Sequence, residues 1–533
     1  MERHASESYY VLGEGLLTVS AGGRDRPTAA GAAEAAAPFR FSRMGPDGEC
    51  HQLDPDTLAV LAKDMAAGGG TGVEESHVPA GYTYLGQFIA HDLSFDKTCV
   101  TLGANVSPAQ LLQGTSPRLD LDSLYGAGPK EPESAVFYED DGIHLKVGHT
   151  VPGVGPGDED GFDLPRGAGS TAAERRKAVI ADPRNDDNLA VAQTHLAFIR
   201  FHNRVVDTMP ACVPRALHFP LARELVTKHY QWMIRHDYLP RICAESVLDD
   251  VFANGRKAFE ADAEPTAPPT MPIEFSVGTF RLGHSMVRGF YSWNPVMGTV
   301  GLKQLFEFSA KGGDLGGNDR LPSAMIADFR RLYDFGEAAR PDLIVAHAEL
   351  NLALRIDTRL AEGLRHLPSG TFGEREVPSD DLRHNLAFRN LSRARMVKLA
   401  SGPQMADFLI GCHVPLARLT REQILGDTKG AGLKGFLPER KDALVERTPL
   451  WFYILREAEL NRGRLNGVGA RIVAETFHRA IEGSQASIVR DPGWRPTLGC
   501  DPTQFRMVDL LRFAFEGSKR LLAPLEPHGS SPM

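Results

Sequence analysis

Clustered cysteines and long apolar runs are both missing from this chain of 533 residues. The 6 cysteines are scattered and form no CxxC pair, which favours free thiols over a zinc site or a disulfide framework. No stretch approaches about eighteen consecutive apolar residues, so a membrane-spanning helix is not expected. The first residues lack a basic start followed by an apolar run. We therefore expect a cytoplasmic protein, with export that uses no recognisable signal as the alternative.

Basic residues are outnumbered as well, because 59 Lys and Arg stand against 68 Asp and Glu and give a net charge of −9. A duplex-binding protein needs a dominant basic face, and no Lys/Arg cluster of that kind is present, so nucleic acid is not an expected partner. Hydrophobic residues make up 42% of the chain, which is enough for a sizeable core and excludes wholesale disorder. No feature indicates a covalent oligomer, and we expect a monomer or a weak homodimer.

Long segments with helical spacing alternate with regions rich in Gly and Pro, whereas strand-like alternation is scarce and short. The class is therefore predicted to be mainly α. Length alone would favour three or four domains at roughly 150 residues each. The predicted helices cover residues 189–209, 221–238, 342–361, 404–410, 449–460 and 470–482.

Some motifs that suggest chemistry are better explained by structure. The glycine run at 68–72 is followed by no Gly-Lys-Ser/Thr, so a phosphate loop is not expected. His195 and His202 lie seven residues apart on one predicted helix face, as do His229 and His236 in a second segment. With no third metal ligand in view, buried core histidines are the preferred interpretation of both pairs.

Two other segments carry chemistry of their own. In GQFIAHD, Gln87 and His91 are four residues apart and share one helix face, while Asp92 points elsewhere. In SPRLDLDSLYG, Ser116, Asp120 and Asp122 alternate, so in an extended loop their oxygens could converge on a hard cation such as Ca²⁺. An exposed turn is the alternative, and the second segment alone would favour it.

Five motifs occur in one order along the chain: GQFIAHD, SPRLDLDSLYG, ADPRNDDN, FRLGHS and RNLSRAR. Together they resemble the animal-type haem peroxidase family, also called the peroxidase–cyclooxygenase superfamily, and most closely a bacterial-like member of its peroxidase branch. The resemblance covers roughly residues 38–525. It implies one large, mostly helical domain around a haem b, with a flexible leader at 1–37 and a tail at 526–533, and it replaces the expectation of several domains.

The resemblance also implies roles for single residues. His91 would be the distal histidine above the haem, with Gln87 beside it and Arg184 as the distal arginine. His284 would be the proximal histidine that ligates the iron, and Asn390 would accept a hydrogen bond from its other ring nitrogen. A calcium ion would be held by the side chains of Asp92, Ser116, Asp120 and Asp122 and by the backbone carbonyl of Arg118.

Four positions differ from residues that members of the family have there. Ala90 stands where many members have an aspartate that forms an ester with haem, and Asp187 stands where they have a glutamate that forms another. At most one ester link is therefore expected, through Asp187, with non-covalent haem as the alternative. Asn188 replaces a methionine that makes a third link in some members, so hypochlorous acid production is not expected. Arg281 stands where the dioxygenases of the superfamily have a radical-forming tyrosine, and this favours the peroxidase branch.

The chemistry agrees with these roles. A neutral His91 would take one proton from peroxide and return it to the leaving oxygen, while Arg184 would stabilise the negative charge on that oxygen. The expected activity is reduction of hydrogen peroxide through an oxoferryl haem, followed by oxidation of small aromatic or halide donors. A haem-dependent dioxygenase of a lipid or specialised metabolite, and a haem-binding redox protein without turnover, stay open as alternatives.

Overall fold

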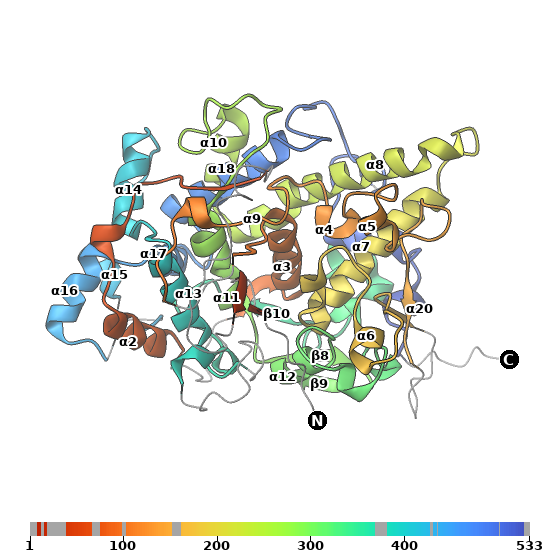
Figure 1. Cartoon of the computed structure of the whole chain (residues 1–533), viewed down its shortest axis with the longest axis horizontal. Helices are drawn as coiled ribbons and strands as arrows, with labels where there is room; N and C mark the ends of the chain where they lie inside the picture. Colours follow the sequence, from red (N-terminus) through yellow and green to blue (C-terminus); the bar gives the residue numbers. More distant parts are fainter. Residues whose placement is uncertain are drawn as a thin grey trace.

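Helices dominate the computed structural model, which describes residues 8–11, 15–18, 39–66, 75–98, 103–151, 161–367, 381–426, 430–433, 435–499 and 501–526. The mainly α class predicted from the sequence is thereby confirmed (Figure 1). The α-helices are α2 (Pro55–Ala66), α3 (Gly81–Leu93), α4 (Asp122–Tyr125), α5 (Pro132–Ala135), α6 (Ala172–Arg176), α7 (Leu189–Asp207), α8 (His218–Met233), α9 (Leu239–Ile242), α10 (Glu245–Asn254), α11 (Gly283–Met286), α12 (Leu302–Glu307), α13 (Leu386–Met396), α14 (Gly402–Gly411), α15 (Arg421–Leu425), α16 (Pro438–Glu446), α17 (Leu450–Leu460), α18 (Gly467–Glu482), α19 (Met507–Ala514) and α20 (Lys519–Leu522).

Strands in the described part of the chain occur only as short pairs. Four pairs are antiparallel and one, β3 with β7, is parallel. The pairs are β1 (Ser8–Val11) with β2 (Gly15–Thr18), β4 (Glu75–Pro79) with β10 (Leu352–Leu354), β3 (Phe41–Ser42) with β7 (Met271–Pro272), β5 (Gly148–His149) with β6 (Phe162–Asp163), and β8 (Phe290–Asn294) with β9 (Gly298–Gly301).

Helices α3 and α7 pack against each other near the middle of the molecule (Figure 1). Helix α7 begins after Asn188, whose side-chain oxygen accepts a hydrogen bond from the backbone N–H of Val191 at 3.0 Å and so caps the helix. Helix α3 also contacts α11, and almost all of its residues are buried. Its surface is therefore covered on nearly every side, and polar groups on it face either a partner or a cavity.

A glycine allows α3 to approach its neighbour closely. A Cβ atom at Gly86 would lie 2.3 Å from the hydroxyl oxygen of Tyr238, which ends the π-helical turn Ile234–Tyr238 after α8. No side chain fits at that separation, so Gly86 is required for this contact. The contact at Gly86 sets how closely α3 approaches Tyr238, and with it the position of the next residue, Gln87.

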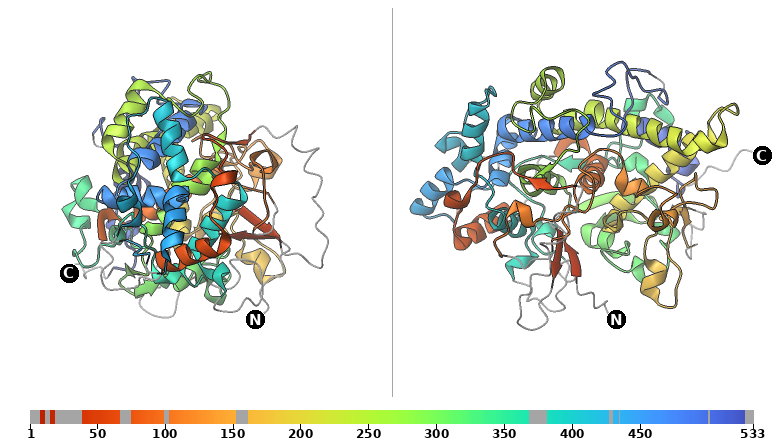
Figure 2. Two further views of the ribbon diagram at one scale, coloured as in Figure 1. Left: turned by 90° about the vertical axis from the view of Figure 1, so that its left-hand side faces the viewer. Right: turned by 45° about the horizontal axis from the view of Figure 1, so that its top comes forward.

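The C-terminal helices, blue in Figure 2, run among the segments of the first half of the chain. Helix α19 contacts α7, and α17 contacts α18 and the 3-10 turn η7 (Thr279–Leu282). The predicted helices at 189–209, 221–238, 404–410, 449–460 and 470–482 are found as α7, α8 with its π-helical turn, α14, α17 and α18. None of the helices in the described ranges is both long and apolar enough to cross a membrane.

The helix predicted for residues 342–361 is wrong. Its centre forms β10, which pairs with β4, and the flanking residues are turns. The side chain of Asn351 donates hydrogen bonds to the carbonyl oxygens of Ser292 and Arg331 and accepts one from the N–H of Ser292, which holds the backbone extended. These long-range contacts override a helical spacing that is only a weak local preference.

Candidate active site

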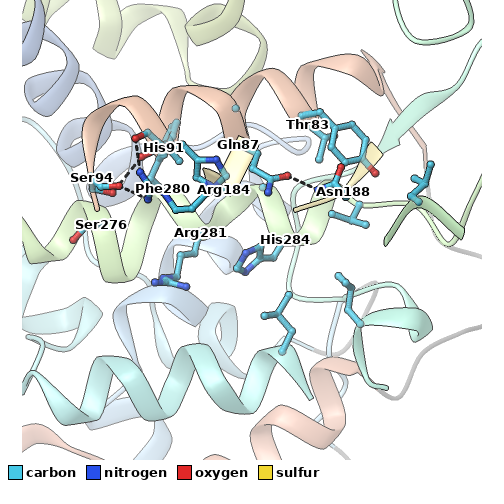
Figure 3. A pocket seen from close by; sticks show the side chains of 18 of the residues that line it. Thr83, Gln87, His91, Ser94, Arg184, Asn188, Ser276, Phe280, Arg281 and His284 are labelled. Carbon is cyan, nitrogen blue, oxygen red and sulfur yellow. Dashed lines mark hydrogen bonds between the residues drawn. The ribbon is translucent and has the colours of Figure 1, made fainter. Parts of the chain in front are cut away.

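One cavity lies between α3 and the junction of η7 with α11 (Figure 3). The space inside it is about 1060 Å³, counting the part that opens to solvent. In Figure 3, α3 carries one group of polar side chains above the cavity, and η7 and α11 carry another below it. The residues predicted from the sequence that line this cavity are Gln87, His91, Arg184, Arg281 and His284.

His91 and Gln87 project from one face of α3, as their spacing predicts (Figure 3). His91 is 2% exposed, and its Nδ1 lies 2.9 Å from the side-chain oxygen of Asn185. An amide oxygen only accepts hydrogen bonds, so Nδ1 carries the ring proton and Nε2 is the basic nitrogen. Burial, and then the charge of Arg184, lowers the pKa of His91 to about 3. The ring is therefore neutral near pH 7 and can take up a proton at Nε2.

Arg184 comes from the 3-10 turn η3 (Pro183–Asp186) and is fixed from two sides. Its Nε donates to both carboxylate oxygens of Asp182, at 2.9 and 3.0 Å. Its Nη1 and Nη2 donate to the carbonyl oxygens of Ser94 and His91, at 2.5 and 2.6 Å. Burial raises the pKa of Asp182, but the charge and hydrogen bonds of Arg184 outweigh it and hold that pKa below its usual value. The guanidinium is thus an immobile cation whose charge Asp182 partly balances.

His284 lies on α11 on the opposite wall of the cavity (Figure 3). Its Nδ1 is 2.7 Å from the side-chain nitrogen of Asn390 on α13, and Nη1 of Arg281 donates to the side-chain oxygen of Asn390 at 3.2 Å. A guanidinium only donates, so it keeps the amide oxygen toward itself and turns the NH₂ group toward His284. The amide therefore donates to His284 here, which reverses the direction expected from the sequence.

The comparisons with known proteins agree with this geometry. Residues 79–299, which include His91, Arg184 and His284, match the family model of the animal haem peroxidases. The matched segment, which is less than half of the chain, resembles an animal haem peroxidase domain. A peroxidase-like protein from Margaritifera margaritifera is 26% identical over 113 residues, and the match covers 21% of this chain but only 14% of that protein.

Solved structures resemble this chain over almost its whole length. Peroxidase A from Dictyostelium discoideum has a TM-score of 0.56 at 15% identity, over 94% of this chain and 96% of that one. A fatty acid alpha-dioxygenase from Oryza sativa has a TM-score of 0.55 at 11% identity, over 92% of this chain and 81% of that one. At such low identity these likenesses establish the fold alone, which this chain shares with both structures.

The matching family implies haem as the cofactor, and the cavity between α3 and α11 fits this group. Two histidines face it from opposite walls. Both are neutral near pH 7, because desolvation and nearby arginines lower the pKa of His91 and of His284 to about 3. Two lining hydroxyls, Thr83 Oγ and Ser276 Oγ, are buried and have no hydrogen-bond partner within the described residues. Buried polar atoms without partners indicate a site that a ligand completes.

Asp187, the predicted ester position, is not among the residues that line the cavity. Its backbone lies beside the cavity wall, where its carbonyl oxygen accepts a hydrogen bond from the Ser309 hydroxyl. Burial raises the pKa of Asp187 well above its usual value, and its Oδ2 has no hydrogen-bond partner in the described structure. Its neighbour Asn188 does line the cavity and donates to the side-chain oxygen of Gln87 at 3.0 Å.

The calcium site that the resemblance implies in the acidic loop stays a prediction. Across the described residues, no group of 3 or more His, Cys, Asp or Glu side chains is placed to hold a metal ion. Like charges repel, and each predicted carboxylate turns to a separate donor. Asp92 accepts from the N–H groups of Leu121 and Ser123, Asp120 accepts from the N–H of Gln485, and Asp122 accepts from the Arg223 side chain.

The acidic side chains of the loop nevertheless have raised pKa values, as carboxylates near an empty cation site would. Burial, and then Asp122, raises the pKa of Asp92 to about 8, and burial with Asp120 raises the pKa of Asp122 to about 6. The hydroxyl of Ser116 is buried and has no hydrogen-bond partner within the described chain. A proton or a cation would relieve this crowding of acidic groups.

Sequence reasoning missed three residues around the distal side. Asp182 holds Arg184, and its position two residues before the arginine is a signal that the sequence contains. Asn185 contacts His91, and its side-chain nitrogen lies 2.9 Å from Nδ1 of His195. His195 was interpreted as a core histidine, and it is indeed buried, but it belongs to the hydrogen-bonded surroundings of the site.

Proposed function

We propose that the protein is a haem-dependent peroxidase that reduces hydrogen peroxide and oxidises small aromatic or halide donors. The observation that carries the proposal is the pair of a buried His91 and a half-buried His284 on opposite walls of one cavity. His284 would bind the iron of a haem b, which requires the Asn390 amide to turn and accept the proton of Nδ1. When bound, the haem supplies the iron and the electrons for the redox chemistry.

The residues of the chain handle the proton and the charge. His91 takes up a proton from peroxide at Nε2 and returns it to the leaving oxygen, while Asn185 keeps the other ring proton on Nδ1. Negative charge that develops on that oxygen is stabilised by Arg184, which Asp182 and two carbonyl groups hold in place. The amide of Gln87, fixed by Asn188, donates to a bound oxygen. None of these groups has to move for the reaction.

An absorbance spectrum tests the proposal. Protein produced with a haem precursor should show a Soret band that shifts promptly with one equivalent of hydrogen peroxide and returns when a phenolic donor is added. A band that bleaches, or that never responds, would favour the redox protein without turnover. A protein that takes up no haem would remove the basis of the proposal.

The dioxygenase alternative rests on the likeness to fatty acid alpha-dioxygenases and on a partly apolar lining that includes Leu302, Leu305 and Phe306. Arg281 opposes it, because it occupies the position of the radical-forming tyrosine and bonds Asn390 instead. Incubation with a long-chain fatty acid and O₂, followed by mass spectrometry, separates the two functions. The peroxidase proposal predicts no oxygenated fatty acid without added peroxide.

We further propose that the haem is held without a covalent bond. Ala90 cannot form an ester, and Asp187 is not part of the cavity lining. Acidified organic solvent should therefore extract all the haem from the loaded protein, and the protein should show no mass increase. Haem that stays with the chain in the wild type, but not in Asp187→Asn, would contradict this.

The acidic loop should make stability depend on pH. The folded protein retains the proton of Asp92 up to about pH 8, whereas the unfolded chain releases it near pH 4, so stability falls as pH rises between these values. From pH 6 to pH 8 we expect a loss of about 2 kcal/mol from this group in protein treated with a chelator. Asp92→Asn should flatten the slope in urea titrations. If Ca²⁺ is the natural occupant, adding it should flatten the slope in the wild type alone.

A further inference from the structure

A second histidine lies behind the distal one and is connected to it through a single amide. His195 sits on α7 and is 1% exposed, and its Nδ1 is 2.9 Å from the side-chain nitrogen of Asn185. The oxygen of the same amide is 2.9 Å from Nδ1 of His91. Asn185 itself is fully buried, so water does not compete for either contact. The three side chains form a chain of hydrogen bonds that ends at the cavity.

The chemistry of the amide fixes where the protons lie. Its oxygen only accepts, so Nδ1 of His91 must carry a proton, and its nitrogen only donates, so Nδ1 of His195 must not. If the amide turned by 180°, both assignments would reverse, and the ring proton of His91 would move to Nε2. Asn185 therefore couples the two tautomers: when Nδ1 of His91 carries a proton, Nδ1 of His195 does not. Because Nδ1 of His195 accepts a hydrogen bond, it favours the orientation of the amide that places the NH₂ group toward His195.

Backbone hydrogen bonds hold the three side chains of this hydrogen-bonded series in place. The N–H of Asn185 donates to the carbonyl of Asp182, and the adjacent Arg184 bonds the carbonyl oxygen of His91. Asn188 caps α7 and so places His195 two helical turns further along. The turn η3 is thus clamped to both helices, and the amide of Asn185 lies between the two rings.

We propose that His195 is a positioning residue: by accepting from Asn185 it keeps the proton of His91 on Nδ1 and keeps Nε2 as the proton acceptor toward the cavity. The role of His195 in catalysis rests on the proposed peroxidase function, whereas its effect on the tautomer of His91 does not depend on that function. A histidine that only filled the core would leave the protons of His91 unaffected when it was replaced.

The tautomers can be read directly by NMR in the full chain without added haem. Long-range ¹⁵N–¹H correlation of histidine-labelled protein reports which nitrogen of each ring carries the proton. In the wild type we expect about a tenfold preference for Nδ1–H in His91, as one neutral hydrogen bond supports. His195→Phe removes the acceptor, and the two forms of His91 should then become about equally populated.

Two further variants separate positioning from packing. His195→Asn puts an amide oxygen near the position of Nδ1 and should restore the wild-type preference. His202→Phe is the matched control, because His202 is a buried histidine two turns later on α7 that bonds Tyr125 and the carbonyl of Ile143 instead. It should leave the His91 signals unchanged. Thermal unfolding of each variant shows whether the fold persists.

The outcomes are distinct. A His91 ring that keeps Nδ1–H in a folded His195→Phe protein would overturn the proposal, as would Nε2–H in the wild type. If His195→Phe does not fold, the same test compares Asn185→Leu with His195→Asn. We then expect mixed tautomers of His91 in Asn185→Leu and the wild-type Nδ1–H form in His195→Asn. Failure of haem loading or peroxide turnover would refute the proposed function and leave this result standing.

Discussion

Replacing His91 with leucine lowers peroxide turnover by about a thousandfold and leaves the haem in place, within the ~10²–10⁴ range for loss of a general acid–base group. Leucine is close to imidazole in size but has no nitrogen, so it removes the proton acceptor without opening the cavity. His284, the proposed iron ligand, lines the opposite wall and is unaffected. The measurement is steady-state oxidation of a phenolic donor, with the Soret band recorded on the same sample.

The variant also leaves the side-chain oxygen of Asn185 buried without its donor, which costs about 1–3 kcal/mol of stability. Assays therefore belong well below the unfolding temperature. His229→Leu is the matched control, because His229 is a buried histidine on α8 that bonds the carbonyl of Leu225 outside the cavity. It should cost stability but not turnover. Full turnover in His91→Leu would contradict the assigned role of His91.

The sequence was sufficient to predict what depends on local spacing and motif order. A four-residue interval on a helix puts Gln87 and His91 on one face, and the structure has them there. The order of the motifs identified Arg184, Arg281 and His284 from distant segments, and all of these line the same cavity. Helices with strong apolar faces, such as α7 and α18, were likewise predictable.

Contacts between distant segments were not predictable from the sequence. Residues 352–354 are extended because they pair with β4 and the preceding Asn351 bonds Ser292 and Arg331, although their spacing suits a helix. The direction of the Asn390 hydrogen bond depends on Arg281, which lies 109 residues away along the chain. Alternating acidic residues predicted converging oxygens, but burial and mutual repulsion send each carboxylate to its own donor. In each case the tertiary environment decides between local options of similar energy.

Replacing His284 with alanine should weaken haem binding by a hundredfold or more, because removal of an outer partner of a metal ligand already costs ~10–100-fold and this change removes the ligand itself. Titration of the unloaded protein with haem, followed at the Soret band, measures the affinity. His478→Ala is the control, since His478 is a buried histidine on α18 that contacts Arg256 away from the cavity. It should bind haem as the wild type does.

Added imidazole distinguishes loss of the ligand from collapse of the site. The alanine variant vacates the volume of one imidazole ring beside Asn390, and the place of Asn390 on α13 does not depend on His284. Free imidazole should enter this space, meet the same amide, and restore both the wild-type spectrum and most of the haem affinity. Rescue by imidazole, but not by a molecule of similar shape without a basic nitrogen such as cyclopentane, would show that the nitrogen of His284 and not its bulk binds the iron. If haem bound equally well to the alanine variant before rescue, the ligand would be a different residue and the assignment of the proximal wall would be wrong.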